Sequence, residues 1–146
     1  MFSVCAIVDA DCAHMCCEPP NEAGRVFLDW LRRRGRLISS AENAAELMRL
    51  NGWRRLFDDL ARAGKLETLT PNCNMADLKR KTKSNDSHIV ALAISGSAKV
   101  VFSNDNLLIR DLKDKEIVGD LNIFIYRTEK QRRHLETKSC RSKQRE

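Results

Sequence analysis

Apolar segments of two different periodicities alternate along the chain. Residues 2–8 form a nearly continuous apolar run, which is typical of a strand buried on both faces of a parallel sheet. The segment that follows has helical spacing and ends at Gly35, before a second short strand at residues 36–38. The apolar face of that helix consists of Ala23, Val26, Phe27, Trp30 and Leu31.

Residues 84–111 predict a helix, a turn, a strand and another helix. The first helix is apolar on nearly every face through residues 89–94, and the pair at 96–97 ends it. Residues 100–102 then form a buried strand, and a new helix starts near Leu107.

The remaining segments complete an alternation of strands and helices. Residues 39–42 match a capping box, in which Ser39 caps a helix and Glu42 reaches back to it. The other predicted elements are a helix at 53–61, a strand at 65–69, a polar connection at 70–83 and an edge strand at 121–126. This alternation predicts an α/β fold with three α/β/α layers around a central, mostly parallel sheet of about five strands.

Four acidic residues are predicted to lie at one edge of this sheet. Asp9 follows the first strand and Asp105 follows a later one, so both lie at carboxyl ends of strands. Asp86 begins a helix, and Glu46 lies one turn into the helix that follows the second strand. We favour Glu46 over Glu42 because the capping box already explains Glu42. Ligands bind at this edge in open α/β sheets.

Grouped carboxylates must take up a proton or bind a cation. Two of them about 4 Å apart repel by about 4 kcal/mol at an effective dielectric constant of roughly 20. Oxygen ligands favour Mg²⁺ or Mn²⁺ over zinc or copper, and such ions stabilise charge on a phosphorus centre. The candidate metal-binding and catalytic residues are Asp9, Glu46, Asp86 and Asp105.

The net charge of +6 is placed unevenly along the chain. Residues 127–146 contain eight Lys or Arg residues against three Asp or Glu residues, so we expect a globular domain over 1–126 and a basic tail over 127–146. Such tails often meet nucleic acid, although a solvated chain end explains the charge equally well. A second basic group precedes Asp86 and is predicted to contact substrate phosphates: Lys79, Arg80, Lys81 and Lys83.

No apolar run approaches the length of a membrane span, and the start of the chain carries an acid where a secretory signal needs small residues. We therefore expect a cytoplasmic protein with no membrane partner, in which the six cysteines are reduced. Four residues suggest a soft-metal site, namely Cys12, His14, Cys16 and Cys17. Because no second cluster with zinc spacing accompanies them, structural thiols are the better interpretation.

In the order of its motifs, the chain resembles the PIN-domain ribonucleases over about residues 4–126. That family begins with an apolar strand ending in an acid, as IVDAD does at Asp9, and has a helical glutamate, as in SSAENAAELMR at Glu46. A third acid opens an apolar helix, here NDSHIVALA with Asp86, and a fourth follows a strand, here VVFSNDNLL with Asp105.

This resemblance implies an endoribonuclease that uses Mg²⁺ or Mn²⁺ to cleave single-stranded or loop RNA. It also makes Asp11 an auxiliary ligand, since relatives often carry a small polar residue there. Many family members are the toxins of bacterial toxin–antitoxin pairs and many pair with themselves, so the expected partners are RNA, an antitoxin protein and a second copy. The basic tail is no part of the family pattern.

Two other functions remain open. An acid pair such as Asp9 and Asp11 after an apolar strand also opens the haloacid dehalogenase-type phosphatases, but those need a paired acidic motif late in the sheet. Residues 119–120 are a poor candidate for that motif. The non-enzymatic alternative is an inactive PIN fold that binds RNA or a protein through residues 127–146, and the presence of all four acids argues against it.

Overall fold

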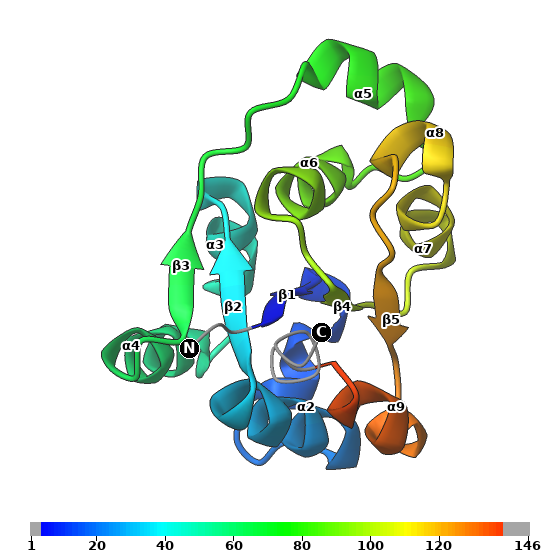
Figure 1. The fold of residues 1–146 in the computed structure, drawn as a ribbon. Helices are drawn as coiled ribbons and strands as arrows, with labels where there is room; N and C mark the ends of the chain where they lie inside the picture. Colours follow the sequence, from blue (N-terminus) through cyan, green and yellow to red (C-terminus); the bar gives the residue numbers. More distant parts are fainter. Residues whose placement is uncertain (1–3, 139–146) are drawn as a thin grey trace.

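The computed structural model describes residues 4–138, which contain one sheet of five strands, all parallel. The strands are β1 (Val4–Val8), β2 (Gly35–Ser39), β3 (Leu66–Thr68), β4 (Val100–Phe102) and β5 (Phe124–Tyr126). Their order across the sheet is β3-β2-β1-β4-β5 (Figure 1). The predicted α/β class and five-strand parallel sheet are confirmed, with β5 at an edge as expected.

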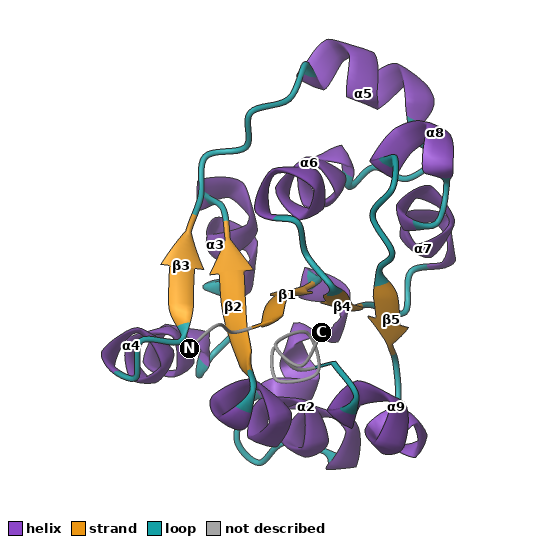
Figure 2. Cartoon of the chain, in the orientation of Figure 1, coloured by secondary structure: helices purple, strands orange, loops and turns teal. Residues whose placement is uncertain are grey.

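Helical segments separate successive strands along the chain, as Figure 2 shows by colour. They are α1 (Ala10–Ala13), η1 (His14–Cys16), α2 (Glu22–Arg33), α3 (Ala41–Leu47), α4 (Trp53–Arg62), α5 (Met75–Lys81), α6 (Ser87–Gly96), α7 (Asn106–Leu112), α8 (Lys115–Val118), η2 (Glu129–Gln131) and α9 (Arg132–Glu136). None of these described helices has the length and apolar character needed to cross a membrane.

Alternate side chains of the strands face two separate apolar layers. In β1, Ala6 and Val8 pack into a cluster with α2 and α4, whereas Ile7 packs into a cluster with α6 and α7. Helix α9 adds to the first layer, and α5 and α8 add to the second. Because both faces of the sheet are covered, the chain forms the three-layer α/β/α arrangement that the apolar strand sequences predict.

The predicted polar connection at residues 70–83 is wrong in part, because α5 lies within it. Asn74 caps this helix by accepting a hydrogen bond from the backbone N–H of Asp77, and Leu78 is buried in the layer that contains α6. Leu78 is the one buried residue among the seven of α5, so this helix has no amphipathic stripe. The periodicity of the sequence therefore could not reveal α5.

Much of the predicted basic tail packs on the domain. Leu135 of α9 is fully buried, and Glu136 forms ion pairs with two arginines at the end of α2. The indole Nε1 of Trp30 donates a hydrogen bond to the carbonyl of Lys138 at 3.1 Å. Residues 127–138 thus belong to the layer built on α2, and residues 139–146 lie outside the described part of the chain.

Candidate metal centre

Three of the predicted acids lie together at the carboxyl edge of the sheet. Asp9 directly follows β1, and Asp105 lies three residues beyond the end of the neighbouring strand β4. Asp86 is the N-cap of α6, the helix that leads into β4. Each of these residues presents a carboxylate oxygen, and the three atoms lie within 4.8 Å of one another.

Asp9 is the most deeply buried of the three, with 3% of its surface exposed. Its backbone N–H donates to the carbonyl of Phe102 at 3.0 Å, which extends the β1–β4 hydrogen bonding by one residue. The hydroxyl of Ser103 donates to Asp9 Oδ2 at 2.8 Å. Backbone and side-chain bonds together fix this carboxylate at the end of the strand.

Asp105 and Asp86 are both helix N-caps, but only Asp105 uses its carboxylate for capping. Asp105 Oδ1 accepts hydrogen bonds from the backbone N–H groups of Leu107 and Leu108, at 3.0 and 3.3 Å. Asp86 makes no side-chain cap bond, and its backbone carbonyl accepts from Ile89 at 2.9 Å instead. The Asp86 carboxylate is therefore available for a ligand rather than committed to its own helix.

The loop before Asp86 is held by a buried carboxylate that the sequence analysis did not single out. Asp111 of α7 accepts hydrogen bonds from the backbone N–H groups of Lys83 and Ser84, at 2.8 and 2.9 Å. It also accepts from the hydroxyl of Ser84 at 2.8 Å. An acid beside Leu112 on the buried face of α7 was the available sequence signal. Asp111 thus fixes Ser84, which lies two residues before Asp86 in the chain.

Two of the three acids, Asp9 and Asp86, have raised pKa values. Burial raises the pKa of Asp9 to about 6, against the lowering effect of the Ser103 hydrogen bond. Burial likewise raises the pKa of Asp86, although the nearby charge of His88 opposes that shift. Neighbouring carboxylates add to both shifts. A bound cation would relieve the same repulsion that a proton relieves in its absence.

Glu46 belongs to a second group, which shares Asp86 with the first. Glu46 lies in the last turn of α3, and its Oε1 is 3.0 Å from Nε2 of His88. Ligand atoms of Glu46, Asp86 and His88 lie within 4.8 Å of one another. The structure thus divides the four predicted acids into two overlapping sets. His88 was missed, and its sequence signal was a histidine two residues after Asp86.

The predicted capping box at residues 39–42 is wrong. Strand β2 includes Ser39, so α3 begins one residue later and Ser40 is its N-cap. The hydroxyl of Ser40 accepts from the backbone N–H of Asn43, while Glu42 Oε2 lies 3.8 Å from Nδ1 of His88. Glu42 therefore faces the second group instead of its own helix terminus.

Asp11 and the cysteines near it do not join these groups. Asp11 is exposed in the first turn of α1, and neither set of ligand atoms includes it. Burial raises the pKa of Cys12 to about 12 and also raises that of Cys16. Within residues 4–138 no potential metal-binding group contains a cysteine. Buried, protonated thiols suit the predicted structural role.

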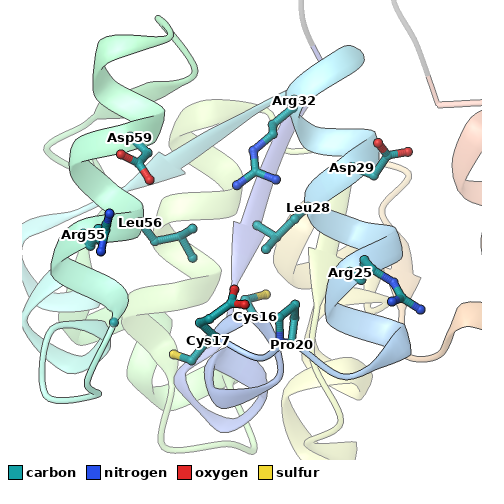
Figure 3. Close-up of a pocket in the computed structure, with 12 residues that line it drawn as sticks. Cys16, Cys17, Pro20, Arg25, Leu28, Asp29, Arg32, Arg55, Leu56 and Asp59 are labelled. Carbon is teal, nitrogen blue, oxygen red and sulfur yellow. The ribbon is translucent and has the colours of Figure 1, made fainter.

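A separate pocket of about 530 Å³ lies between α2 and α4 (Figure 3). Leu28 and Leu56 line it together with charged side chains of both signs, and Cys16 and Cys17 lie at one end. None of the four predicted acids lines this pocket. The pocket is therefore separate from the group formed by Asp9, Asp86 and Asp105.

The predicted basic residues before Asp86 are exposed, and three of them lie on α5. Arg80 and Lys81 form ion pairs with Asp77 of the same helix, at 2.6 and 3.3 Å. Lys79 also lies in α5, and Lys83 lies in the loop that Asp111 holds. Pairing with Asp77 partly neutralises two of these four cations.

Arg127, which belongs to the predicted basic tail, lies at the same edge of the sheet as the candidate centre. It directly follows β5, whose neighbour β4 leads to Asp105. Its guanidinium Nε donates to Oδ1 of Asn104 at 3.1 Å. Arg127 is exposed, and its bond to Asn104 holds the guanidinium beside the residue that precedes Asp105.

Comparison of the chain with protein families, with characterised proteins and with solved structures finds no match.

We predict that ionisation of Asp9 destabilises the metal-free protein. The pKa of Asp9 is about 6 in the folded chain and 3.8 as a reference, so the folded state binds this proton more tightly. The bound proton stabilises the fold fully below about pH 4, and this stabilisation disappears as the pH rises through 6. The free energy of unfolding should therefore fall by an amount on the order of 3 kcal/mol over this range. Urea unfolding in chelator across this range measures it.

Asp9→Asn is the matched variant, since an amide oxygen can still accept from Ser103. The variant should lose less stability than the parent between about pH 4 and pH 7. Parallel pH profiles for the two proteins would show that Asp9 does not carry this effect.

Proposed function

We propose that the chain is a metal-dependent endoribonuclease that hydrolyses phosphodiester bonds of RNA. The observation that carries this proposal is the convergence of Asp9, Asp86 and Asp105, with the carboxylate of Asp86 unused by its own helix. The resemblance of the acidic motifs to those of PIN-domain ribonucleases supports the same function. All three acids come from positions that this resemblance assigns.

The donor set fits Mg²⁺ or Mn²⁺. The three carboxylates offer only oxygen atoms as ligands. The hydrogen bond from Ser103 already fixes the carboxylate of Asp9. A divalent cation bound there would supply Lewis acidity, which favours ionisation of a water and offsets charge on the phosphate. The protein would preorganise the site, because the three carboxylates are fixed at the ends of strands and helices and need not move when the cation binds.

Arg127 would hold the RNA backbone beside these acids. The bond from Nε to Asn104 fixes one edge of the guanidinium and leaves its two terminal nitrogens to donate to phosphate oxygens. Such a contact would offset the repulsion between a polyanion and an acidic centre. Lys79 and Lys83, which are exposed, would extend the path of the backbone.

Asp86→Asn should abolish most RNA cleavage. The amide keeps the shape of the side chain but removes a charge that a cation needs, so we expect a loss of at least about 100-fold. Single-turnover cleavage of a single-stranded RNA in Mg²⁺ or Mn²⁺, and in chelator, measures this.

Asp120→Asn is the control, because Asp120 is exposed in the connection before β5. A parent that cleaves equally well in chelator would exclude the metal-dependent mechanism. Hydrolysis of a phosphate monoester in place of RNA would favour the phosphatase alternative, and RNA binding without cleavage would favour the inactive fold.

Arg127→Ala should weaken RNA binding and make it less dependent on salt. If Arg127 contacts one phosphate, the slope of log Kd against log salt should fall by roughly 0.7 for a single strand. Arg62→Ala on α4 is the control, because Arg62 is exposed and lies at the end of the helix that leads into the amino end of β3. Equal slopes for the parent and Arg127→Ala would remove Arg127 from the RNA contact.

A further inference from the structure

His88 is the one nitrogen donor among the groups of potential metal ligands in residues 4–138. It is the second residue of α6, and its side chain is 9% exposed. The ring faces α3, with Nε2 toward Glu46 and Nδ1 toward Glu42 of that helix. Each nitrogen of this buried imidazole therefore has a carboxylate near it.

The spacing of His88 and Glu46 suits two ligands of one ion. Their atoms Nε2 and Oε1 lie 3.0 Å apart. Two ligands at about 2.1 Å from a metal and at right angles to each other are separated by roughly 3.0 Å. Asp86 supplies the third atom of the group, within 4.8 Å of both.

We propose that His88, Glu46 and Asp86 form a second cation site, which prefers a transition-metal ion to Mg²⁺. This inference rests on the proposed function, because it adds a cation next to the one held by the three aspartates. Imidazole binds ions such as Mn²⁺, Co²⁺ and Zn²⁺, whereas Mg²⁺ is bound through oxygen. The mixed nitrogen and oxygen donors therefore set the metal preference of the centre.

Glu42 fits the role of a carboxylate that orients a metal-binding histidine. Such histidines usually direct their second ring nitrogen at a carboxylate or a carbonyl, which fixes the tautomer. Glu42 Oε2 lies 3.8 Å from Nδ1 of His88, and its side chain is 69% exposed, so it can move closer without disturbing the core. With Nδ1 protonated and facing Glu42, the lone pair of Nε2 is free for the ion.

Because both groups contain Asp86, the two ions would be neighbours. The carboxylate of Asp86 caps no backbone N–H of its own helix. One carboxylate can bridge two cations through its two oxygens. The shared aspartate predicts that loss of Asp86 affects both sites, whereas loss of His88 affects only one.

The experiment is pulsed electron paramagnetic resonance of the full chain loaded with Mn²⁺. The parent should show a ¹⁴N coupling from a directly bound imidazole, and His88→Gln should lack it. His14→Gln is the matched control, since His14 is exposed and belongs to neither group, and it should keep the signal. Calorimetric titration should show that His88→Gln weakens Co²⁺ binding by about 10-fold or more, with Mg²⁺ binding unchanged.

Absence of ¹⁴N coupling in the Mn²⁺-loaded parent would overturn the second site. Equal weakening of Mg²⁺ and Co²⁺ binding would also overturn it, because it would make His88 a support for Glu46 rather than a ligand. If His88→Gln fails to fold, Glu46→Gln should give the same selective loss of Co²⁺ binding. A ¹⁴N signal without RNA cleavage would support the second cation site and contradict the ribonuclease activity. Mg²⁺-dependent cleavage without the ¹⁴N signal would support the ribonuclease activity and contradict the second cation site.

Discussion

The parallel pairing of β1 with β4 is the constraint on which the candidate centre depends. Val8 lies opposite Phe102, and the next backbone hydrogen bond, from Asp9 to Phe102, closes the pairing at the carboxyl edge. This register sets Asp9 against Ser103, which is 94 residues away in the chain. The same register fixes the end of β4, from which a short connection leads to Asp105. A shift by one residue would turn Asp9 to the other face of the sheet.

The edge of the sheet holds acids together against their own repulsion. Asp105 is tied to the first turn of α7, Asp9 to Ser103, and the loop before Asp86 to Asp111. These contacts are made mostly by backbone donors, which persist whether or not a cation is bound. Burial is the main cause of the raised pKa values of Asp9 and Asp86, and the neighbouring carboxylates add to it. Groups whose pKa values are shifted in this way cluster at functional sites.

The sequence predicted the parts of this edge that depend on local pattern. Asp9 and Asp105 were located because buried strands precede them, and Asp86 because an apolar helix follows it. The start of α3 was misplaced by one residue, because pairing of β2 with β3 reaches Ser39 and this contact is not local.

The local sequence pattern could not predict the contact between His88 and Glu46, because this contact is not local either. The two residues are 42 positions apart, and only the packing of α3 near α6 brings them together. Arg127 was hidden because its sequence neighbours are basic and suggested a tail. Because β5 lies beside β4, Arg127 lies at the sheet edge that also carries Asp105. Tertiary contacts thus bring His88 to Glu46 and place Arg127 at the edge of the sheet. The local sequence pattern was enough to locate the three aspartates at that edge.

The most direct measurement is anomalous diffraction from crystals of the chain soaked in Mn²⁺. An ion held by the convergent aspartates predicts a peak within roughly 2.5 Å of carboxylate oxygens of Asp9, Asp86 and Asp105. The peak should disappear from crystals of Asp86→Asn grown in the same form. Crystals that show these three side chains well ordered, with no anomalous peak among them, would contradict a metal centre at this edge of the sheet.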